Sequence, residues 1–179
     1  MIIDELITDR TQADVDEVYS LKRKFKTVDE SSGYILIQHL QEKDLVFDGT
    51  QAELNKYNAG LKGAINYSDL NRIGNAIRYI RDSAQAIGIS ISVVGKNDWA
   101  SGQYVAPADA QQMFTDLQAI KTATGAQQSI PASFNGINYD GMNRIETMLL
   151  EAYTIVSAVI SNYQMGGAVV SGVNDWLTA

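Results

Sequence analysis

Side chains able to do acid, base or nucleophilic chemistry are few in this chain. Cysteine is absent and His39 is the only histidine. These counts exclude a disulfide framework, a thiolate zinc site and a cysteine nucleophile, and they leave a histidine triad or a two-histidine metal site incomplete. We interpret His39 as an ordinary surface or partly buried residue. Because no phosphate-binding glycine loop, nucleophile elbow or HExxH motif occurs, we predict no catalytic, cofactor-binding or metal residues, and a protein that is not an enzyme.

Two carboxylate pairs remain as alternatives for acid and base chemistry. Glu146 and Glu151 lie on one expected helix, and Asp98 and Asp175 each precede a tryptophan. Either pair could supply one acid and one base. The simpler interpretation, which we favour, is that the first pair occupies solvated helix positions and the second pair caps turns, because no pocket motif accompanies them.

Two tryptophans and two arginines give the other binding hypotheses. An exposed indole beside an aspartate suits stacking on a sugar ring, so Trp99 and Trp176 could bind a saccharide, although a tryptophan more commonly fixes the end of a strand. Arg72 and Arg144 could contact an anion or a partner. We favour a structural role, in which each guanidinium ties its helix to a neighbouring carbonyl or acid.

A repeated phrase contains both arginines. "INYSDLNRI" (65–73) and "INYDGMNRI" (137–145) are identical at six of nine positions and stand 72 residues apart. Asparagine is a preferred helix N-cap, so each phrase predicts the start of a helix. Tyr67 and Tyr139 occupy the same place in the two copies, and we interpret them as core or interface anchors.

Each copy continues into an amphipathic helical pattern. The first helix is expected over residues 67–86, where Asp69 completes a capping box, whereas Gly141 leaves the second box incomplete. Apolar residues recur at helical spacing in both copies. They are Leu70, Ile73, Ile77, Ile80, Ala84 and Ile87 in the first helix, and Met142, Ile145, Leu149, Ala152, Val156, Val159 and Tyr163 in the second.

A short strand and an Asn-Asp-Trp turn are expected after each helix. "ISISVV" (89–94) alternates apolar and serine residues, and "GAVVSGV" (167–173) is its weaker counterpart. We expect the two strands to pair as a small antiparallel ribbon. The chain is thus predicted to be mainly α, with about five helices and a small β-element, built around an internal duplication of helix, strand and Asn-Asp-Trp turn.

Three further helices complete the expected fold. They cover residues 8–25, 50–61 and 106–125, with Thr8 or Thr11 capping the first and a Thr50–Glu53 capping box opening the second. Pro107 suits the first turn of the third, and Gly125 its end. The apolar run at 34–37 could be a short strand or a helical turn.

These elements suggest one compact domain overall, which 179 residues can support. We divide it into an N-terminal helical segment, a first repeat unit, a connecting helix with its loop, and a second repeat unit. Their ranges are 1–62, 63–99, 100–134 and 135–179.

Charge and hydropathy limit the partners. The net charge is −7, and an acidic surface without a basic stripe disfavours nucleic-acid binding. The start of the chain lacks the pattern of a secretory signal. The longest apolar stretch, residues 152–173, is interrupted by polar residues, so we expect a buried helix followed by a strand and no membrane contact.

Five phrases together resemble a known protein family. They are "ELITDRTQADVDEVYSLK", "GLKGAINYSDLNRIGNAIRYI", "ISVVGKNDW", "PADAQQMFTDLQAIKTA" and "YDGMNRIETMLLEAY". They are similar to uncharacterised proteins and N-terminal modules encoded in phages and prophages of Firmicutes, usually among tail, baseplate or tail-fibre genes. Residues 26–49 depart from that family's pattern.

The resemblance implies a virion component, made in the host bacterial cytoplasm and built into the tail. It implies other phage tail or baseplate proteins as partners, and a homo-oligomer. The leading hypothesis is therefore a structural or adaptor protein acting through protein contacts. A host-surface saccharide-binding module is the alternative, and a tail-associated hydrolase is the third.

Overall fold

The structure is a computed structural model, and it describes residues 2–27, 45–133 and 136–174. These residues form five α-helices, one short 3-10 helix and a two-stranded antiparallel sheet, so the predicted mainly helical class is confirmed. The contacts divide the chain into two compact units, Met1–Thr8 with Asn66–Ala179, and Asp9–Ile65. From the sequence we had expected a single compact domain with its first internal boundary after residue 62.

The unit Asp9–Ile65 contains two capped helices and one two-stranded antiparallel sheet. It contains α1 (Gln12–Lys22), β1 (Phe25–Thr27), β2 (Leu45–Phe47) and α2 (Gln51–Asn58). Thr11 and Thr50 each form the N-cap half of a capping box, which confirms both predicted helix starts. The unit has a small apolar core of Val18, Leu21 and Leu61, with Phe47, Tyr57 and Ala64 packed against it. His39 and the run at 34–37 lie outside the described residues.

The two-stranded sheet forms in a different place from the predicted one. β1 pairs with β2, with Phe25 opposite Phe47, whereas residues 89–94 are extended without pairing to a described strand and residues 167–173 lie within a helix. The predicted ribbon of these two segments is therefore wrong. Residues 89–94 have the alternating pattern of a strand, but no described strand pairs with them. Their expected partner, residues 167–173, belongs to α5.

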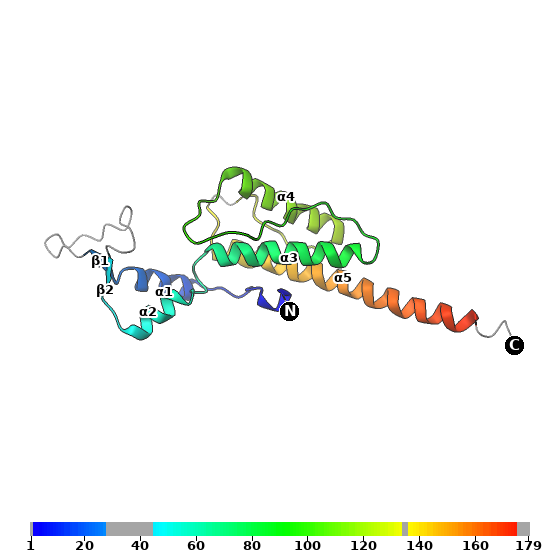
Figure 1. Cartoon of the computed structure of the whole chain (residues 1–179), viewed down its shortest axis with the longest axis horizontal. Helices are drawn as coiled ribbons and strands as arrows, with labels where there is room; N and C mark the ends of the chain where they lie inside the picture. Colours follow the sequence, from blue (N-terminus) through cyan, green and yellow to red (C-terminus); the bar gives the residue numbers. More distant parts are fainter. Residues whose placement is uncertain (1, 28–44, 134–135, 175–179) are drawn as a thin grey trace. The chain divides into compact units, whose positions relative to one another are not determined.

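The other unit is a three-helix body with an N-terminal segment. Its elements are η1 (Ile2–Glu5), α3 (Tyr67–Gln85), α4 (Pro107–Thr124) and α5 (Tyr139–Asn174). In Figure 1 the helices α3, α4 and α5 lie side by side, and the connection between α3 and α4 runs back along them. Their facing sides form one apolar core. Its fully buried members include Ile73, Ile77, Ile80, Leu117, Ile120, Met142, Ile145, Met148 and Leu149.

The predicted helix ends are confirmed for α3 and α4. Asn66 accepts from the backbone of Ser68 and Asp69 and completes the capping box of α3, while α4 begins at Pro107 and ends at Gly125 in the left-handed conformation. Gly88, at φ +81°, closes α3, with Ile89 N bonded to Ala84 O at 3.0 Å and Gly88 N to Gln85 O at 3.0 Å. This is the Schellman arrangement that commonly ends helices.

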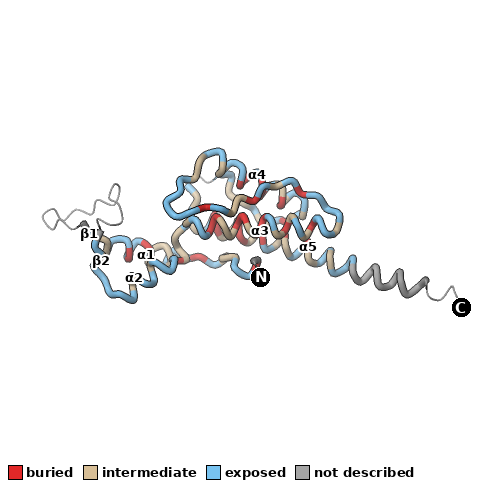
Figure 2. The backbone as a smooth tube through the Cα atoms, in the orientation of Figure 1, coloured by how far each residue is buried: buried red, intermediate tan, exposed pale blue. Residues whose placement is uncertain are grey.

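α5 continues beyond the core that its first half completes. It has 36 residues where α3 has 19, and Figure 1 shows it running past the end of α3. Its apolar stripe is buried as far as Val156, but Val159 is 42% exposed and Tyr163 is 73% exposed. Figure 2 shows the corresponding change from buried to exposed backbone along this helix. The predicted buried face therefore ends before Val159, because no described element covers Val159 or Tyr163.

Candidate functional site

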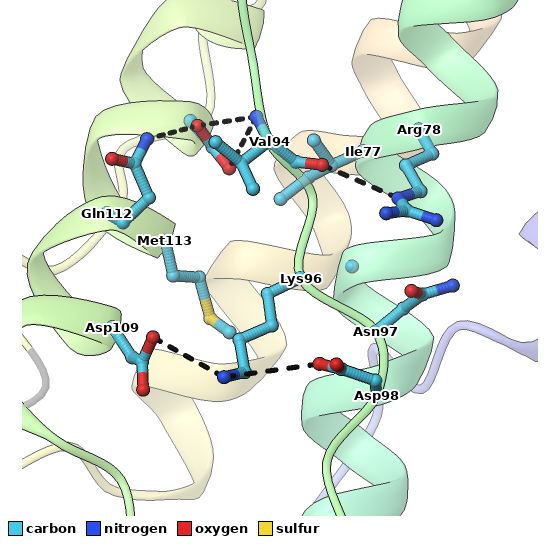
Figure 3. A pocket seen from close by; sticks show the side chains of 11 residues that line it. Ile77, Arg78, Val94, Lys96, Asn97, Asp98, Asp109, Gln112 and Met113 are labelled. Atoms are coloured by element: carbon cyan, nitrogen blue, oxygen red, sulfur yellow. Dashed lines mark hydrogen bonds and ion pairs between the residues drawn. The ribbon is translucent and has the colours of Figure 1, made fainter.

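A polar pocket of the three-helix unit lies where the connection after α3 crosses between α3 and α4. Figure 3 shows this pocket, of about 260 Å³, with side chains from three segments lining it. Gly74, Ile77 and Arg78 come from α3, Val94 and residues 96–98 come from the connection, and Asp109, Gln112, Met113 and Asp116 come from α4.

A glycine in α3 permits the close crossing. A Cβ built on Gly74 would lie 2.0 Å from the carbonyl oxygen of Lys96 and 2.7 Å from its carbon. These distances are far shorter than van der Waals contact, and the atoms met belong to backbone, which has little freedom to move aside. The segment can therefore cross α3 only at a residue without a side chain.

Asp116 fixes the same segment from the side of α4. Its side chain is buried at 1% exposure, and its carboxylate accepts hydrogen bonds from Val94 N at 3.2 Å, Gly95 N at 2.8 Å and Gln112 Nε2 at 2.9 Å. Asp116 is thus already occupied in holding the crossing segment.

Lys96 is the main cation at the mouth of the pocket. Its ammonium group lies 3.5 Å from Asp109 Oδ1 and 4.0 Å from Asp98 Oδ1, as the dashed lines in Figure 3 show. It also lies 4.6 Å from the centre of the Trp99 ring, within the range of a cation–π contact. The positive charge of Lys96 therefore offsets the negative charges of Asp98 and Asp109.

Trp99 is a buried anchor of this connection. The residue is 4% exposed, and its backbone N and O are bonded by the Asn71 side chain at 2.8 Å and 2.9 Å. A buried indole has no free face for a sugar ring, so the stacking hypothesis is wrong for Trp99. The favoured alternative, a tryptophan that fixes the end of a strand, is also wrong in detail, because residues 89–99 form no strand and Trp99 anchors an irregular connection. Its Nε1 has no hydrogen-bond partner among the described residues. Trp176 and Asp175 lie outside them.

Glu146 lies at the centre of a second polar cluster, inside the core. It is fully buried, and its two oxygens accept from Arg72 Nε and Nη2 at 3.0 Å each. Arg72 also pairs with Asp69, and Ile7 N donates to Glu146 at 2.5 Å. The interpretation of Glu146 as a solvated helix position is therefore wrong, whereas the structural role of Arg72 is confirmed.

The charge of Arg72 is stabilised by these acids. Burial alone would lower the pKa of the guanidinium, but the hydrogen bonds and charges of Glu146 and Asp69 outweigh it and raise the pKa above its ordinary value. Arg72 therefore keeps its positive charge throughout the ordinary pH range. The cluster joins α3, α5 and the N-terminal segment of this unit through hydrogen bonds and ion pairs.

The other predicted residues are placed separately along α5. Glu151 accepts from the backbone of Gln127 and Gln128 at 2.9 Å and 2.8 Å, and these bonds lower its pKa. It therefore shares no acid–base site with Glu146. Arg144 donates to Ser129 O at 3.1 Å and to Ser129 Oγ at 2.7 Å, which confirms its structural role.

Two exposed residues complete the comparison with the sequence predictions. Tyr67 is 46% exposed, so it is not a core anchor, and its alternative role at an interface stays a prediction. The side chain of Asp98 is 81% exposed and contacts Lys96, a cation, where a turn cap had been expected.

Sequence reasoning missed Asp116 and Gly74. Asp116 stands on the apolar stripe of α4 beside Met113, Leu117 and Ile120, and a carboxylate on such a stripe signals a buried hydrogen-bond acceptor. Gly74 stands in the middle of a strong helical pattern, where a glycine weakens the helix unless something packs closely on it. Both signals were visible in the sequence.

Within residues 2–27, 45–133 and 136–174, no group of three metal-binding side chains gathers, and no helix is long and apolar enough to cross a bilayer. Comparisons with protein-family models, with curated proteins and with solved structures gave no match.

Proposed function

We propose that this chain is a structural or adaptor protein that acts through contacts with other proteins, as a component of a phage tail or baseplate. The tail assignment rests on the family resemblance of the five sequence phrases. The part that geometry supports is contact with another protein, and the observation that carries it is the exposure of Val159 and Tyr163 on the apolar stripe of α5.

The apolar stripe of α5 continues without a break past its internal partners. Its residues follow one another at alternating spacings of three and four, which is the heptad pattern of helices that pack lengthwise on other helices. The buried members end at Val156, and the next two, Val159 and Tyr163, are exposed. The stripe residues as far as Val156 therefore pack in the internal core, whereas Val159 and Tyr163 continue the stripe on an exposed face.

The composition of this part of α5 specifies the partner further. Residues 152–174 contain no charged side chain, whereas a solvent-exposed helix ordinarily has a charged face. An identical neutral helix matches such a surface in both spacing and charge. We therefore include a homo-oligomer in the proposal, with α5 of one copy packed along α5 of another.

Saccharide binding was the alternative function, with Trp99 and Trp176 as its stacking platforms. Trp99 is buried, so this half of the alternative has lost its structural basis. Trp176 lies outside the described residues, so no observation favours saccharide binding at that residue. Protein contact is therefore the better-supported function.

The test is the mass of the species in solution, measured by light scattering during size-exclusion chromatography. We expect the wild-type chain to be an oligomer, and Val159→Glu with Tyr163→Glu to yield a monomer, because each charge would be desolvated in the interface. Ser161→Glu with Asn162→Glu is the matched control, since it adds the same two charges on exposed residues of the same helix outside the stripe.

A wild-type monomer, or a double variant with the wild-type mass, would contradict the α5 interface. The tail assignment is tested separately by mass spectrometry of purified particles from a strain that carries this sequence. A chain absent from the particles would remove the virion role and leave the solution interface as an independent result.

A further inference from the structure

A second surface of the three-helix unit has a different chemistry from the α5 stripe. A groove of about 730 Å³ lies over α4, between the extended residues 90–92 on one wall and residues 130–132 on the other. Its floor consists of the outward-facing side chains of α4. The lining residues on α4 are Gln111, Phe114, Thr115, Gln118, Ala119, Thr122 and Ala123.

The first wall is extended backbone whose hydrogen-bonding groups have no partner among the described residues. Ile89 N closes the end of α3, and Val94 N and Gly95 N bond to Asp116. Between these fixed points, the N–H and C=O groups of residues 90–92 make no hydrogen bond with any described residue. Hydrogen bonds therefore fix both ends of the segment, whereas its middle residues, 90–92, have no described hydrogen-bond partner.

The second wall is fixed at one end only. Gln127 N and Gln128 N are held by Glu151, and Ser129 O accepts from Arg144. Beyond these bonds, the backbone groups of residues 130–132 make no hydrogen bond with a described residue. Two stretches of backbone without a described hydrogen-bond partner therefore line the groove.

The side chains of the groove are neutral and mixed in character. None of its lining residues carries a charge; they are hydroxyl, amide and apolar groups. On the first wall Ile91 is buried at 7% exposure while Ser90 and Ser92 are exposed, which is the alternation of a strand that has one face on a core. The volume falls in the range of ordinary binding pockets.

We propose that this groove binds an extended, uncharged peptide strand of another protein by strand addition to residues 90–92. In this mode the backbone groups of the strand supply the hydrogen bonds, and alternate side chains fit the floor. The unpaired backbone favours a peptide over other neutral ligands, because only another backbone offers donors and acceptors at the repeat of an extended chain. The neutral lining disfavours a charged peptide, whose desolvation nothing in the groove would offset.

The inference rests on the proposed function only in taking a protein as the partner. It concerns a surface separate from Val159 and Tyr163, so each can fail without the other. It also explains the strand predicted at residues 89–94: the segment has the alternating pattern of a strand, and the bound peptide would be the strand that pairs with it.

The experiment uses the full chain and a synthetic peptide of alternating threonine and valine, roughly eight residues long, the length of an ordinary strand. Binding is followed by NMR titration, and amide hydrogen exchange is measured with and without the peptide. We expect saturable binding that slows exchange at Ser90, Ile91 or Ser92, because formation of backbone hydrogen bonds protects amides.

Two variants and a control for each locate the bonds. Ser92→Pro removes one backbone donor and should weaken binding about tenfold, as expected for one lost hydrogen bond, whereas Ser92→Ala keeps the donor and should bind like the wild type. Gln118→Trp fills the floor and should abolish binding. Gln85→Trp, the same change at an exposed α3 position outside the groove, should not.

Three results would overturn the proposal. They are the absence of saturable binding at millimolar peptide, binding that leaves exchange at residues 90–92 unchanged, and equal weakening by Ser92→Pro and Ser92→Ala. A neutral oligosaccharide is titrated in parallel. If it saturates the groove while the peptide does not, the partner class is wrong. Melting curves of every variant show that loss of binding does not come from unfolding, since Gln118 and Ser92 are exposed.

Discussion

The two copies of the repeated phrase start their helices alike and then serve different environments. Asn66 caps α3 through Ser68 N at 2.8 Å, and Asn138 accepts from Gly141 N at 2.9 Å at the start of α5. Arg72 of the first copy enters a buried acid cluster, whereas Arg144 of the second bonds a loop serine. The phrase therefore encodes a helix start, and the neighbours of each copy decide what its arginine does.

The two helices also end differently, and one residue explains much of this. Gly88 closes α3 in a left-handed conformation, and the position 72 residues later is Ile160, which continues α5. A β-branched residue is strongly disfavoured in that conformation. The first helix consequently stays within its unit, while the second extends beyond it and presents its apolar stripe.

The largest expected effect comes from breaking the buried cluster. Arg72→Met should destabilise the chain by about 3–5 kcal/mol, because it leaves the buried Glu146 charge without its partner. Arg144→Met, the same change in the second copy, should cost about 1 kcal/mol, the usual value of a partly exposed hydrogen bond. Urea unfolding of both variants measures the difference. Equal losses would show that the two copies are energetically equivalent and would contradict the comparison.

Gly74 tests the close crossing of α3, which the second copy lacks. Its counterpart 72 residues later is Glu146, a large side chain. Gly74→Ala should destabilise the unit by about 1–3 kcal/mol, the usual cost of overpacking, although alanine is the better helix former. The measurement is urea unfolding against Ser83→Ala, a change in the same helix away from the crossing. A more stable Gly74→Ala variant would mean that the crossing segment moves aside easily.

Gly88 tests the helix stop itself. Gly88→Ala should cost about 1 kcal/mol, because a residue with a Cβ is strained at φ +81°. The corresponding Gly60→Ala, at φ +90° in the other unit, is a control for the general cost of this conformation. Thermal melting of the two variants is compared. No loss of stability in Gly88→Ala would indicate that α3 can end without a left-handed residue.

The smallest effect is expected from acidification, through a contact that only the second helix makes. Backbone hydrogen bonds from Gln127 and Gln128 lower the pKa of Glu151 from its ordinary 4.5. The stabilisation is therefore present above pH 4.5 and is lost as the pH falls through the lower folded-state pKa. Glu151→Gln should flatten this part of the stability profile. An unchanged profile in the variant would assign the acid sensitivity to other carboxylates.

Local chemistry made the helices predictable from the sequence. Thr11, Thr50, Asn66 and Gly125 act through neighbours within a few residues, so their roles could be inferred from spacing alone. The burial of Ile73 and Ile77 followed from periodicity in the same way. These features depend little on where the rest of the chain lies.

The polar sites depended on contacts between distant residues and were harder to foresee. Glu146 is distinguished from a solvated helix residue only by Arg72 and Ile7, which are 74 and 139 positions away. Trp99 is buried in a core cluster with residues of three helices, and its backbone is held by Asn71, 28 positions away. The absent ribbon has a similar cause, since alternation specifies an extended segment but does not specify a partner.

The hydrogen bond from Ile7 to Glu146 also constrains the order of events during synthesis. Ile3 and Ile7 are made well before Glu146, yet their unit is completed only after Glu146 has been made, and residues 9–65 form a separate compact unit in between. Long-range closure of this kind is slow compared with local folding. The unit Asp9–Ile65 can therefore fold while the other unit is still being translated, and Ile3 and Ile7 reach their places only after it.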